Sequence, residues 1–353
     1  MKKRNVSTLK VAATYIGTVV GAGFATGQEV LQFFNRFGAM GLVGIILASY
    51  MFILFGYIIM DLGKRLNSRS HEEIIKYSAG NTLGSLIDIM ITFFLFGSFT
   101  AMIAGTGALI NQQFNLPHAI GNIFMTLLTG LTVATGINGV INSISYVVPF
   151  LLTAVIGTSL YSFIHTPPVI TAPVTNISKN LLLNNWLMAA ILYVSYNIII
   201  SIAVLGPLGR EAKDYKSIRK GAILGGTGLG LGAAMIYLSL SGNIAVANLE
   251  VPMIAIASQL SPKVQTAYAL VLVAEVYTTA VGSLYGFTSR ITDIQKKPFR
   301  SKLLITIISI AALLASQFGF SNIVKYLYPA VGYGGIIMLI CLIYIKKKGF
   351  DKL

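Results

Sequence analysis

The chain has 353 residues, of which 55% are hydrophobic and only 10% are charged, and its mean hydropathy is +0.77. A soluble domain carries about 25% charged residues, so this composition excludes an ordinary soluble protein and indicates a chain that lies mostly in a lipid bilayer. The apolar runs are long and hydrophobic on all sides, whereas barrel strands alternate polar and apolar residues. The sequence therefore predicts an all-α membrane protein, whose helices satisfy their own backbone in hydrocarbon.

Ten segments reach the roughly 20 residues that a helix needs to cross the bilayer. They are residues 11–35, 39–63, 84–111, 117–135, 140–164, 186–208, 219–242, 264–289, 302–322 and 326–345. The longest stretches between them, 165–185 and 243–263, are too short to form a separate core. We therefore expect a single integral membrane domain over residues 1–353, with a short helix in an outer loop at 245–262.

The basic residues predict how these helices are oriented. If the N-terminus is inside, all but four of the 26 Lys and Arg residues fall in inner segments. The four exceptions are Arg36, Lys179, Lys263 and Lys325. Inner loops of membrane proteins are enriched in Lys and Arg, so both chain ends are predicted to be cytoplasmic. This distribution also explains the net charge of +15 as anchoring to the bilayer, and no nucleic-acid partner is expected.

The first predicted helix reads TYIGTVVGAGFATGQEV and has glycines at positions 17, 21, 23 and 27. Small residues in membrane helices often serve close helix packing, and that is one interpretation. The other is a broken helix whose unwound middle offers backbone groups to a ligand. Because each glycine is costly inside a helix, four of them within so short a stretch favour a break near Gly21 and Gly23.

The sixth predicted helix places Ser195, Tyr196 and Asn197 at mid-span, and Gly206 and Pro207 near its inner end. Taken alone, these polar residues predict hydrogen bonds to a neighbouring helix. However, interrupted segments at corresponding positions of two halves are typical of a transporter site. We therefore predict an inverted five-plus-five repeat, over residues 11–164 and 186–345, with broken first and sixth helices.

The eighth predicted helix carries Glu275, Thr278, Thr279 and Gly282 on one face. A carboxylate at mid-membrane depth is functional by default because it is costly there. Hydroxyl oxygens are hard ligands that suit a small cation, although threonines also bond back to their own helix. The pattern indicates a site for a coupling cation or proton.

Glu29 is the other acid predicted to lie within a span. At a helical rise it lies about 9 Å outward from Gly23. Together with Gln28 it could line an outer vestibule as a gating or protonatable group, or it could pair with Arg36. Asp88 is expected to face the lipid headgroups.

Enzyme motifs are missing from the sequence, so we expect no enzymatic activity and no catalytic residues. The glycines of GTGLGLG at 226–232 lie inside a predicted helix and are interpreted as a packing face. The three histidines, His71, His118 and His165, fall in or beside predicted loops. They are expected to be solvated and are not predicted to bind a metal.

The segment GTVVGAGF resembles the first-helix motif of the amino acid–polyamine–organocation superfamily, whose members share the five-plus-five fold of the leucine transporter. With SYN in the sixth helix, VGAGFATGQE also resembles the bacterial membrane proteins of the YkvI family. The superfamily resemblance implies a sodium site between helices 1 and 8. Its first-helix carbonyls fall on Gly17 and Val20, and its eighth-helix ligands fall on Glu275, Thr278 and Thr279. Glu275 stands where a small residue is usual, so sodium, a proton or a cationic substrate all remain open.

The resemblance implies a secondary active transporter in a bacterial cell membrane, which works by alternating access on a small polar or amino-acid-like solute. The coupling ion would be sodium or a proton, with no other cofactor. The expected solute site comprises Thr18, Gly21, Ala22, Gly23, Phe24, Ser195, Tyr196 and Asn197. A helix-end dipole at the break would favour a solute carboxylate. A solute sensor on the same fold, without net transport, is the alternative, as in the similar spore germinant receptors.

Overall fold

The computed structural model describes residues 6–68, 70–134, 137–170, 182–292 and 298–348. The basic residues Lys2, Lys3, Arg4, Arg69, Lys179, Lys296, Lys297 and Lys352, which entered the orientation prediction, lie outside these ranges. Within the described part of the chain the regular structure is helical, apart from an isolated parallel bridge between Val6 and Ala212. The predicted all-α class is therefore confirmed.

The first half of the chain forms seven α-helices. They are α1 Thr8–Val19, α2 Ala22–Ala25, α3 Gln28–Phe33, α4 Ala39–Arg65, α5 His71–Phe114, α6 His118–Ala134 and α7 Ile137–His165. The second half contains α8 Trp186–Glu211, α9 Tyr215–Gly242, α10 Pro252–Ser258, α11 Pro262–Ile291, α12 Pro298–Ala315, α13 Phe320–Asn322 and α14 Tyr328–Lys348. A π-helical turn at Ile323–Leu327 joins α13 to α14, and 3₁₀ turns occupy Asn35–Phe37, Ile244–Asn248 and Ser316–Phe318.

Seven helical segments in the described ranges are long and apolar enough to cross a membrane. They are α4, α5, α8, α9, α11 and the segments Phe299–Phe318 and Phe320–Lys348. Two further apolar helices, α6 and Pro149–His165 of α7, are shorter. The first predicted span is divided among α1, α2 and α3. A membrane protein with several spanning helices is thus established, while the count of ten and the inverted repeat stay predictions.

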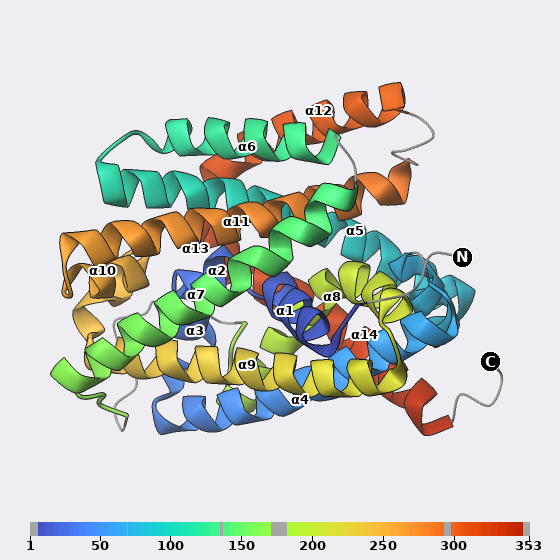
Figure 1. Ribbon diagram of the computed structural model, residues 1–353, viewed down its shortest axis with the longest axis horizontal. Helices are drawn as coiled ribbons and strands as arrows, with labels where there is room; N and C mark the ends of the chain where they lie inside the picture. Colours follow the sequence, from blue (N-terminus) through green and yellow to red (C-terminus); the bar gives the residue numbers. More distant parts are fainter. Residues whose placement is uncertain (1–5, 69, 135–136, 171–181, 293–297, 349–353) are drawn as a thin grey trace.

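The helices pack around α1, which lies in the middle of the molecule (Figure 1). Helices α4 and α9 run along one edge, and α6 and α12 lie together at the opposite edge, with α5 and α11 between (Figure 1). Helix α5 is bent at Gly80, whose φ of 75° and ψ of −179° suit only glycine. The chain begins and ends toward the same side of the molecule (Figure 1).

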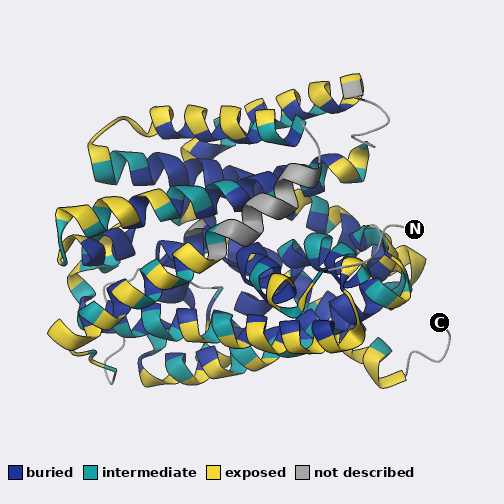
Figure 2. Cartoon of the chain, viewed as in Figure 1, coloured by how far each residue is buried: buried dark blue, intermediate teal, exposed yellow. Residues whose placement is uncertain are grey.

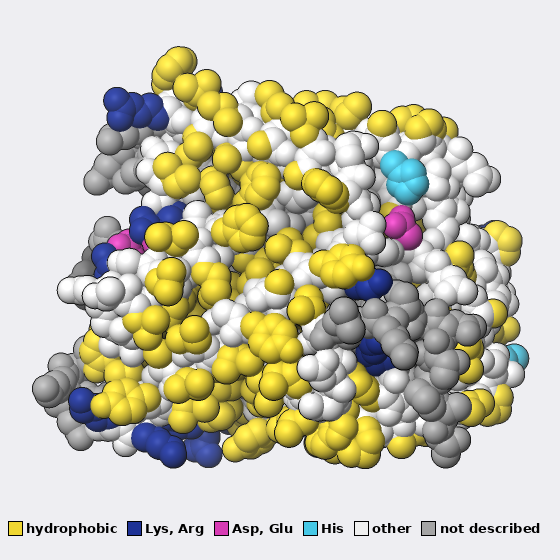
Figure 3. Space-filling view, turned by 180° about the vertical axis from the view of Figure 1, so that it is seen from behind, with side chains coloured by type: hydrophobic (Ala, Val, Ile, Leu, Met, Phe, Trp, Pro, Cys, Tyr) yellow, Lys and Arg dark blue, Asp and Glu magenta, His cyan; other side chains and the backbone are white. Residues whose placement is uncertain are grey.

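Large apolar side chains cover much of the surface. The outward faces of α6 and α12 are exposed along their length (Figure 2), and their residues include Leu131 and Leu314, which are 70% and 69% exposed. Figure 3 shows apolar side chains across the middle of another face, with Lys and Arg gathered toward one end. Soluble monomers seldom expose contiguous apolar areas of this extent, so this surface fits contact with lipid.

The glycines of α9 serve close packing, as the sequence predicted. A methyl group on Gly225 would collide with the ring of Tyr15, and one on Gly226 would collide with Ile53 of α4. Ser49 of α4 also donates a hydrogen bond of 3.0 Å to the Gly226 carbonyl. Helix α9 therefore packs tightly against α1 and α4, and this supports the inner wall of the central site.

The turn before α9 shows why that helix begins where it does. Asp214 is the N-cap residue, and its side chain accepts a hydrogen bond of 2.7 Å from the Ser217 amide. Such a cap satisfies an amide that would otherwise lack a partner. The hydrogen bonds from Ser217 also lower the pKa of the Asp214 carboxyl, since they favour its charged form.

Candidate functional site

The first helix is broken at the position that its glycines predict. Helix α1 ends at Val19, Val20 is extended with φ of −69° and ψ of 127°, and helix resumes at Ala22. A second interruption occurs at Gly27, whose φ of 87° lies in the left-handed region. Two interruptions separated by four helical residues leave backbone groups without the partners that a continuous helix supplies. The break prediction for helix 1 is confirmed.

Neighbouring elements hold the broken segment in place. The Tyr268 hydroxyl of α11 donates a hydrogen bond of 2.8 Å to the Ala25 carbonyl, and the Met253 amide of α10 donates one of 3.0 Å to the Thr26 carbonyl. The Gln28 side chain donates to the Leu249 carbonyl at 2.5 Å. The short helix predicted in the outer loop is α10, and it packs over the break as part of the bundle. The Gln28 side chain, which is only 3% exposed, joins the broken segment to the loop before α10 through its bond to Leu249.

Oxygen atoms of α1 and α11 converge where α1 ends. The Thr279 hydroxyl donates a hydrogen bond of 3.0 Å to the Val20 carbonyl, across the two helices. The Thr278 hydroxyl donates one of 2.9 Å to the Glu275 carbonyl of its own helix, which is the back-bonding alternative for this residue. Gly17 lines a small cavity together with Thr18, Leu95, Ile200, Ala203, Val204, Thr278, Thr279, Gly282 and Ser283. The structure therefore brings together the residues that the resemblance to sodium-coupled transporters assigns to one cation site.

The donor set at this place is made of carbonyl and hydroxyl oxygens, which are the ligands that small hard cations prefer. Thr279 is 8% exposed and Thr278 is 1% exposed, so few waters would compete with a bound ion. A methyl group on Gly21 would lie 3.3 Å from Cγ2 of Thr279, and this short distance shows how closely the two chains approach. The oxygen types present suit a small cation, while the cavity beside them is lined mainly by apolar surface.

The side chain of Glu275 is fully buried, and neither of its carboxylate oxygens has a hydrogen-bond partner in the structure's described part. Of the Glu275 oxygens, only the main-chain carbonyl accepts a side-chain hydrogen bond in the described part of the chain, from the Thr278 hydroxyl. An unpartnered carboxylate within a membrane protein is costly when charged. A proton or a cation bound to this carboxylate would remove that cost.

The prediction that helix 6 is broken is wrong in this structure. Helix α8 runs without interruption from Trp186 to Glu211. Two of the three polar residues at its middle donate hydrogen bonds: Asn197 donates to the Tyr193 carbonyl of its own helix at 2.9 Å, and Ser195 donates to the Gly332 carbonyl of α14 at 2.7 Å. Only the Ser195 bond joins a neighbouring helix, which is the interpretation that the sequence favoured for this patch taken alone.

The remaining predicted solute residues differ in what they offer. The Thr18 hydroxyl donates to the Thr14 carbonyl at 2.6 Å, and the Phe24 ring packs against Gly232 of α9. The Thr18 hydroxyl and the Phe24 ring therefore already have partners within the protein. By contrast, the Tyr196 hydroxyl is buried and has no hydrogen-bond partner among the described residues. Oδ1 of Asn197 is likewise buried without a partner among the described residues, so two predicted residues of α8 keep a polar atom that a ligand could bind.

Glu29 does not lie 9 Å outward from Gly23, as a continuous helix would require. A methyl group on Gly23 would lie 2.5 Å from Cγ and 2.7 Å from Cδ of Glu29. The left-handed turn at Gly27 reverses the path of the chain and returns the carboxylate to the break. The alternative ion pair between Glu29 and Arg36 is not among the ion pairs of the described residues. The Arg36 guanidinium instead lies over the Phe37 ring, with 5.8 Å between Cζ and the ring centroid. Sequence reasoning placed Glu29 too far out because it assumed helical rise through Gly27.

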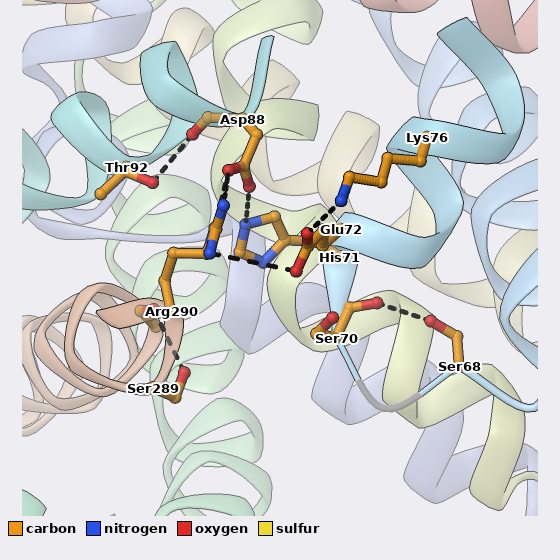
Figure 4. A network of polar contacts seen from close by, with 10 residues as sticks. Ser68, Ser70, His71, Glu72, Lys76, Asp88, Thr92, Ser289 and Arg290 are labelled. Atoms are coloured by element: carbon orange, nitrogen blue, oxygen red, sulfur yellow. Dashed lines mark hydrogen bonds and ion pairs between the residues drawn. The ribbon is translucent and has the colours of Figure 1, made fainter. Parts of the chain in front are cut away.

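A charged network joins α5 to the end of α11 (Figure 4). Asp88 is 4% exposed and accepts hydrogen bonds from two nitrogens of Arg290, with Nε at 2.7 Å. Nε2 of His71 lies 3.2 Å from the other Asp88 oxygen. Asp88 is thus paired within the protein and does not face headgroups. His71 is buried, whereas His118 and His165 are exposed as expected.

Comparison with known proteins places the chain in a family. No protein-family model matches it. It is 33% identical to the Bacillus subtilis (strain 168) uncharacterized membrane protein YkvI over 333 residues, which cover 94% of each chain. It is 27% identical to the uncharacterized protein YyaD of the same organism over 336 residues, which cover 93% of this chain and 94% of that one.

Solved transporter structures share the fold at low sequence identity. MhsT in complex with L-phenylalanine matches with a TM-score of 0.66 and 17% identity, over 93% of this chain and 87% of that chain. A Na⁺-coupled sialic acid symporter matches with a TM-score of 0.69 and 12% identity, over 94% and 77%. Inward-facing Mhp1 matches with a TM-score of 0.65 and 14% identity, over 94% and 74%. The chain belongs to the YkvI family of membrane proteins and has the leucine-transporter fold.

Proposed function

We propose that the protein is a secondary transporter of a small polar or amino-acid-like solute, driven by a sodium or proton gradient. The observation that carries the proposal is the meeting of α1 and α11, where Thr279 bonds to the Val20 carbonyl at the break of α1. The fold shared with sodium-coupled symporters supports it as well. In such folds, broken helices near the midplane supply the site around which the halves move.

The chemistry of the oxygen cluster supports coupling by a cation. A hydroxyl group either donates its proton or offers lone pairs, so Thr278 and Thr279 can bond to carbonyls or turn their oxygens toward an ion. An ion held by Gly17, Val20 and these hydroxyls would tie α1 to α11 more strongly than one hydrogen bond does. A ligand shifts a conformational equilibrium only by its different affinity for the two states, and such a site would supply that difference.

The cavity beside Gly17 and Thr279 supports a path to one side of the membrane. Its lining continues along α8 to Val204 and along α11 to Ser283. Both directions lead toward Arg210 and Arg290, at the helix ends that the basic residues predict to be cytoplasmic. We propose that the coupling ion leaves toward the cytoplasm along this route.

Uptake by proteoliposomes tests the proposal. Wild-type protein is reconstituted and assayed with a panel of labelled amino acids and amines, under an imposed sodium gradient or an imposed pH gradient. We expect gradient-driven uptake of at least one solute, and loss of the sodium-driven component in Thr279→Val. Thr227→Val is the matched control, because Thr227 is exposed on α9 and bonds only to its own helix.

The Glu275→Gln variant distinguishes coupling to sodium from coupling to protons. If the proton couples transport through Glu275, this variant loses uptake driven by pH, whereas a sodium-coupled transporter keeps sodium-driven uptake. Tight solute binding without any flux in the wild type would contradict the transporter proposal and favour the sensor.

A further inference from the structure

The break in helix 1 holds a buried carboxylate that the predicted solute site did not include. Glu29 is 3% exposed, and its Oε2 atom has no hydrogen-bond partner within the described ranges. None of the ion pairs described in the structure includes Glu29. Its side chain lies against Gly23, so the carboxyl group stands beside the short helix α2, between the two interruptions of helix 1. A charge in this position is costly unless a cation or a proton joins it.

Aromatic rings lie beside this carboxylate. Tyr193 and Tyr196 of α8 are fully buried, with ring centroids 5.7 Å apart, and the ring of Tyr328 of α14 is tilted by 44° to that of Tyr196, with centroids 4.8 Å apart. Phe33, four residues beyond Glu29, lies 5.5 Å from the rings of both α8 tyrosines. All three tyrosines lie near the Glu29 carboxyl group. The carboxyl group of Glu29 therefore lies beside a cluster of aromatic rings contributed by α3, α8 and α14.

Two tyrosine hydroxyls in this cluster also lack partners. The hydroxyls of Tyr193 and Tyr196 have no hydrogen-bond partner in the described part of the chain. The Tyr196 hydroxyl is a neighbour of the Glu29 carboxylate but is not aligned for a hydrogen bond in this conformation. Buried polar atoms are nearly always bonded in native structures, so a ligand with several donors would complete this set.

The sign of the charge identifies the ligand. Ring faces carry negative electrostatic potential and attract cations, and a carboxylate does so more strongly. A solute carboxylate, which the helix-end argument from sequence favoured at Gly21 to Phe24, would instead be repelled by Glu29. A protonated primary amine has three N–H donors, and these match the unpartnered oxygens of Glu29, Tyr193 and Tyr196.

We propose that Glu29, together with Tyr193 and Tyr196, binds a protonated primary amine of the transported solute, an inference that rests on the transporter function proposed above. The solute's positive group would then sit at the break of helix 1, between α3 and α8. The recognition element is the charge of the solute, and its remaining part would extend along the aromatic wall toward Tyr328.

Binding to the purified protein tests this assignment with two matched series of probes. One series is isoamylamine, 4-methylpentanoate, isoamyl alcohol and leucine, and the other is phenethylamine, 3-phenylpropanoate, 2-phenylethanol and phenylalanine. Calorimetric titration and thermal unfolding report binding. We expect the amine of at least one series to bind 10-fold or more tightly than its acid and its alcohol.

Single substitutions test which residues bind the amine. Glu29→Gln keeps the shape of the side chain but removes the charge, and we expect about 10- to 100-fold weaker amine binding, the range for loss of a charged hydrogen bond. Its unfolding temperature without ligand should be unchanged or higher, because a buried unpaired charge is removed. Tyr196→Phe should weaken amine binding less than Glu29→Gln does, since the ring remains. Glu250→Gln, in the loop before α10, is the control and should bind as the wild type does.

Three results would overturn the assignment: no amine binds, an acid or alcohol binds as tightly as its amine, or Glu29→Gln binds the amine normally. In the last case, a changed pH dependence of uptake would assign Glu29 to proton coupling. Failure of the amine-site assignment can be distinguished from failure of the transporter proposal. Amine binding that depends on Glu29 without flux would retain the site and reject transport, whereas flux of a solute without an amine would do the reverse.

Discussion

The close contact between Gly23 and Glu29 makes Gly23→Ala a sharp test of the site geometry. The added methyl carbon would lie 2.5 Å from Cγ and 2.7 Å from Cδ of Glu29, well inside ordinary van der Waals contact. Since Cγ is near the base of the side chain, rotation of the carboxylate cannot relieve the clash. Glu29 would have to move against the tyrosine rings, and forcing extra volume into a packed core costs about 1–3 kcal/mol.

Gly21→Ala, two residues earlier on the same segment, is the matched control. There the new methyl group would lie 3.3 Å from Cγ2 of Thr279 and 3.6 Å from Cε of Met102. A small shift of either side chain relieves these contacts. The substitution also restricts the unfolded chain, which stabilises by about 0.4–1 kcal/mol where the backbone is compatible. We therefore expect Gly21→Ala to remain within about 1 kcal/mol of the wild type.

Thermal unfolding of the purified protein in detergent is the assay. For a chain of 353 residues, the expected destabilisation of Gly23→Ala corresponds to a fall of about 1–4 °C in Tm. Glu29→Ala removes the clashing atoms, so the double variant with Gly23→Ala should recover stability, and a double-mutant cycle isolates that coupling. Equal Tm values for the two glycine variants, or a cycle without coupling, would refute the placement of Glu29 at the break.

Three further changes test other parts of the structure by the same thermal assay. Thr279→Val leaves a buried carbonyl at the helix break without its donor and should destabilise by about 1–3 kcal/mol, while Thr279→Ser should restore most of it. Gly80→Ala should destabilise by about 1–3 kcal/mol because its backbone region suits only glycine, whereas Gly282→Ala, with no atom within 4 Å of the new methyl group, should be neutral or stabilising. Arg290→Gln removes the cationic partner of buried Asp88 and should destabilise the protein by about 2 kcal/mol. This cost is smaller than for a fully buried ion pair because Arg290 is 34% exposed. A stability equal to that of the wild type would show that this network contributes nothing.

Local features of the sequence predicted much of the scaffold. The break near Gly21 was predictable because glycines destabilise a helix wherever they occur, and the packing face around Gly226 was predictable because small residues permit close approach. The spacing of Glu275, Thr278 and Thr279 placed them on one face of a helix, since 3.6 residues make a turn. Their meeting with Val20 came from the family resemblance.

Helix 6 and Glu29 were predicted incorrectly for related reasons. The break in helix 6 was inferred from the expected repeat of the broken first helix, but the Asn197 side-chain amide donates to the Tyr193 carbonyl within an intact helix. Glu29 was placed by counting residues along a helix, but the positive φ at Gly27 redirects the chain. A glycine permits such a turn without requiring it.

The sequence by itself determined that this is a helical membrane protein with a discontinuous first helix, because hydropathy and glycine cost are properties of short segments. Only the tertiary structure decided which polar groups share one site. It brought Thr279 of α11 to the end of α1 and returned Glu29 to Gly23 among the tyrosines of α8. Such contacts join residues far apart in the chain, and they follow from how the helices pack around the break.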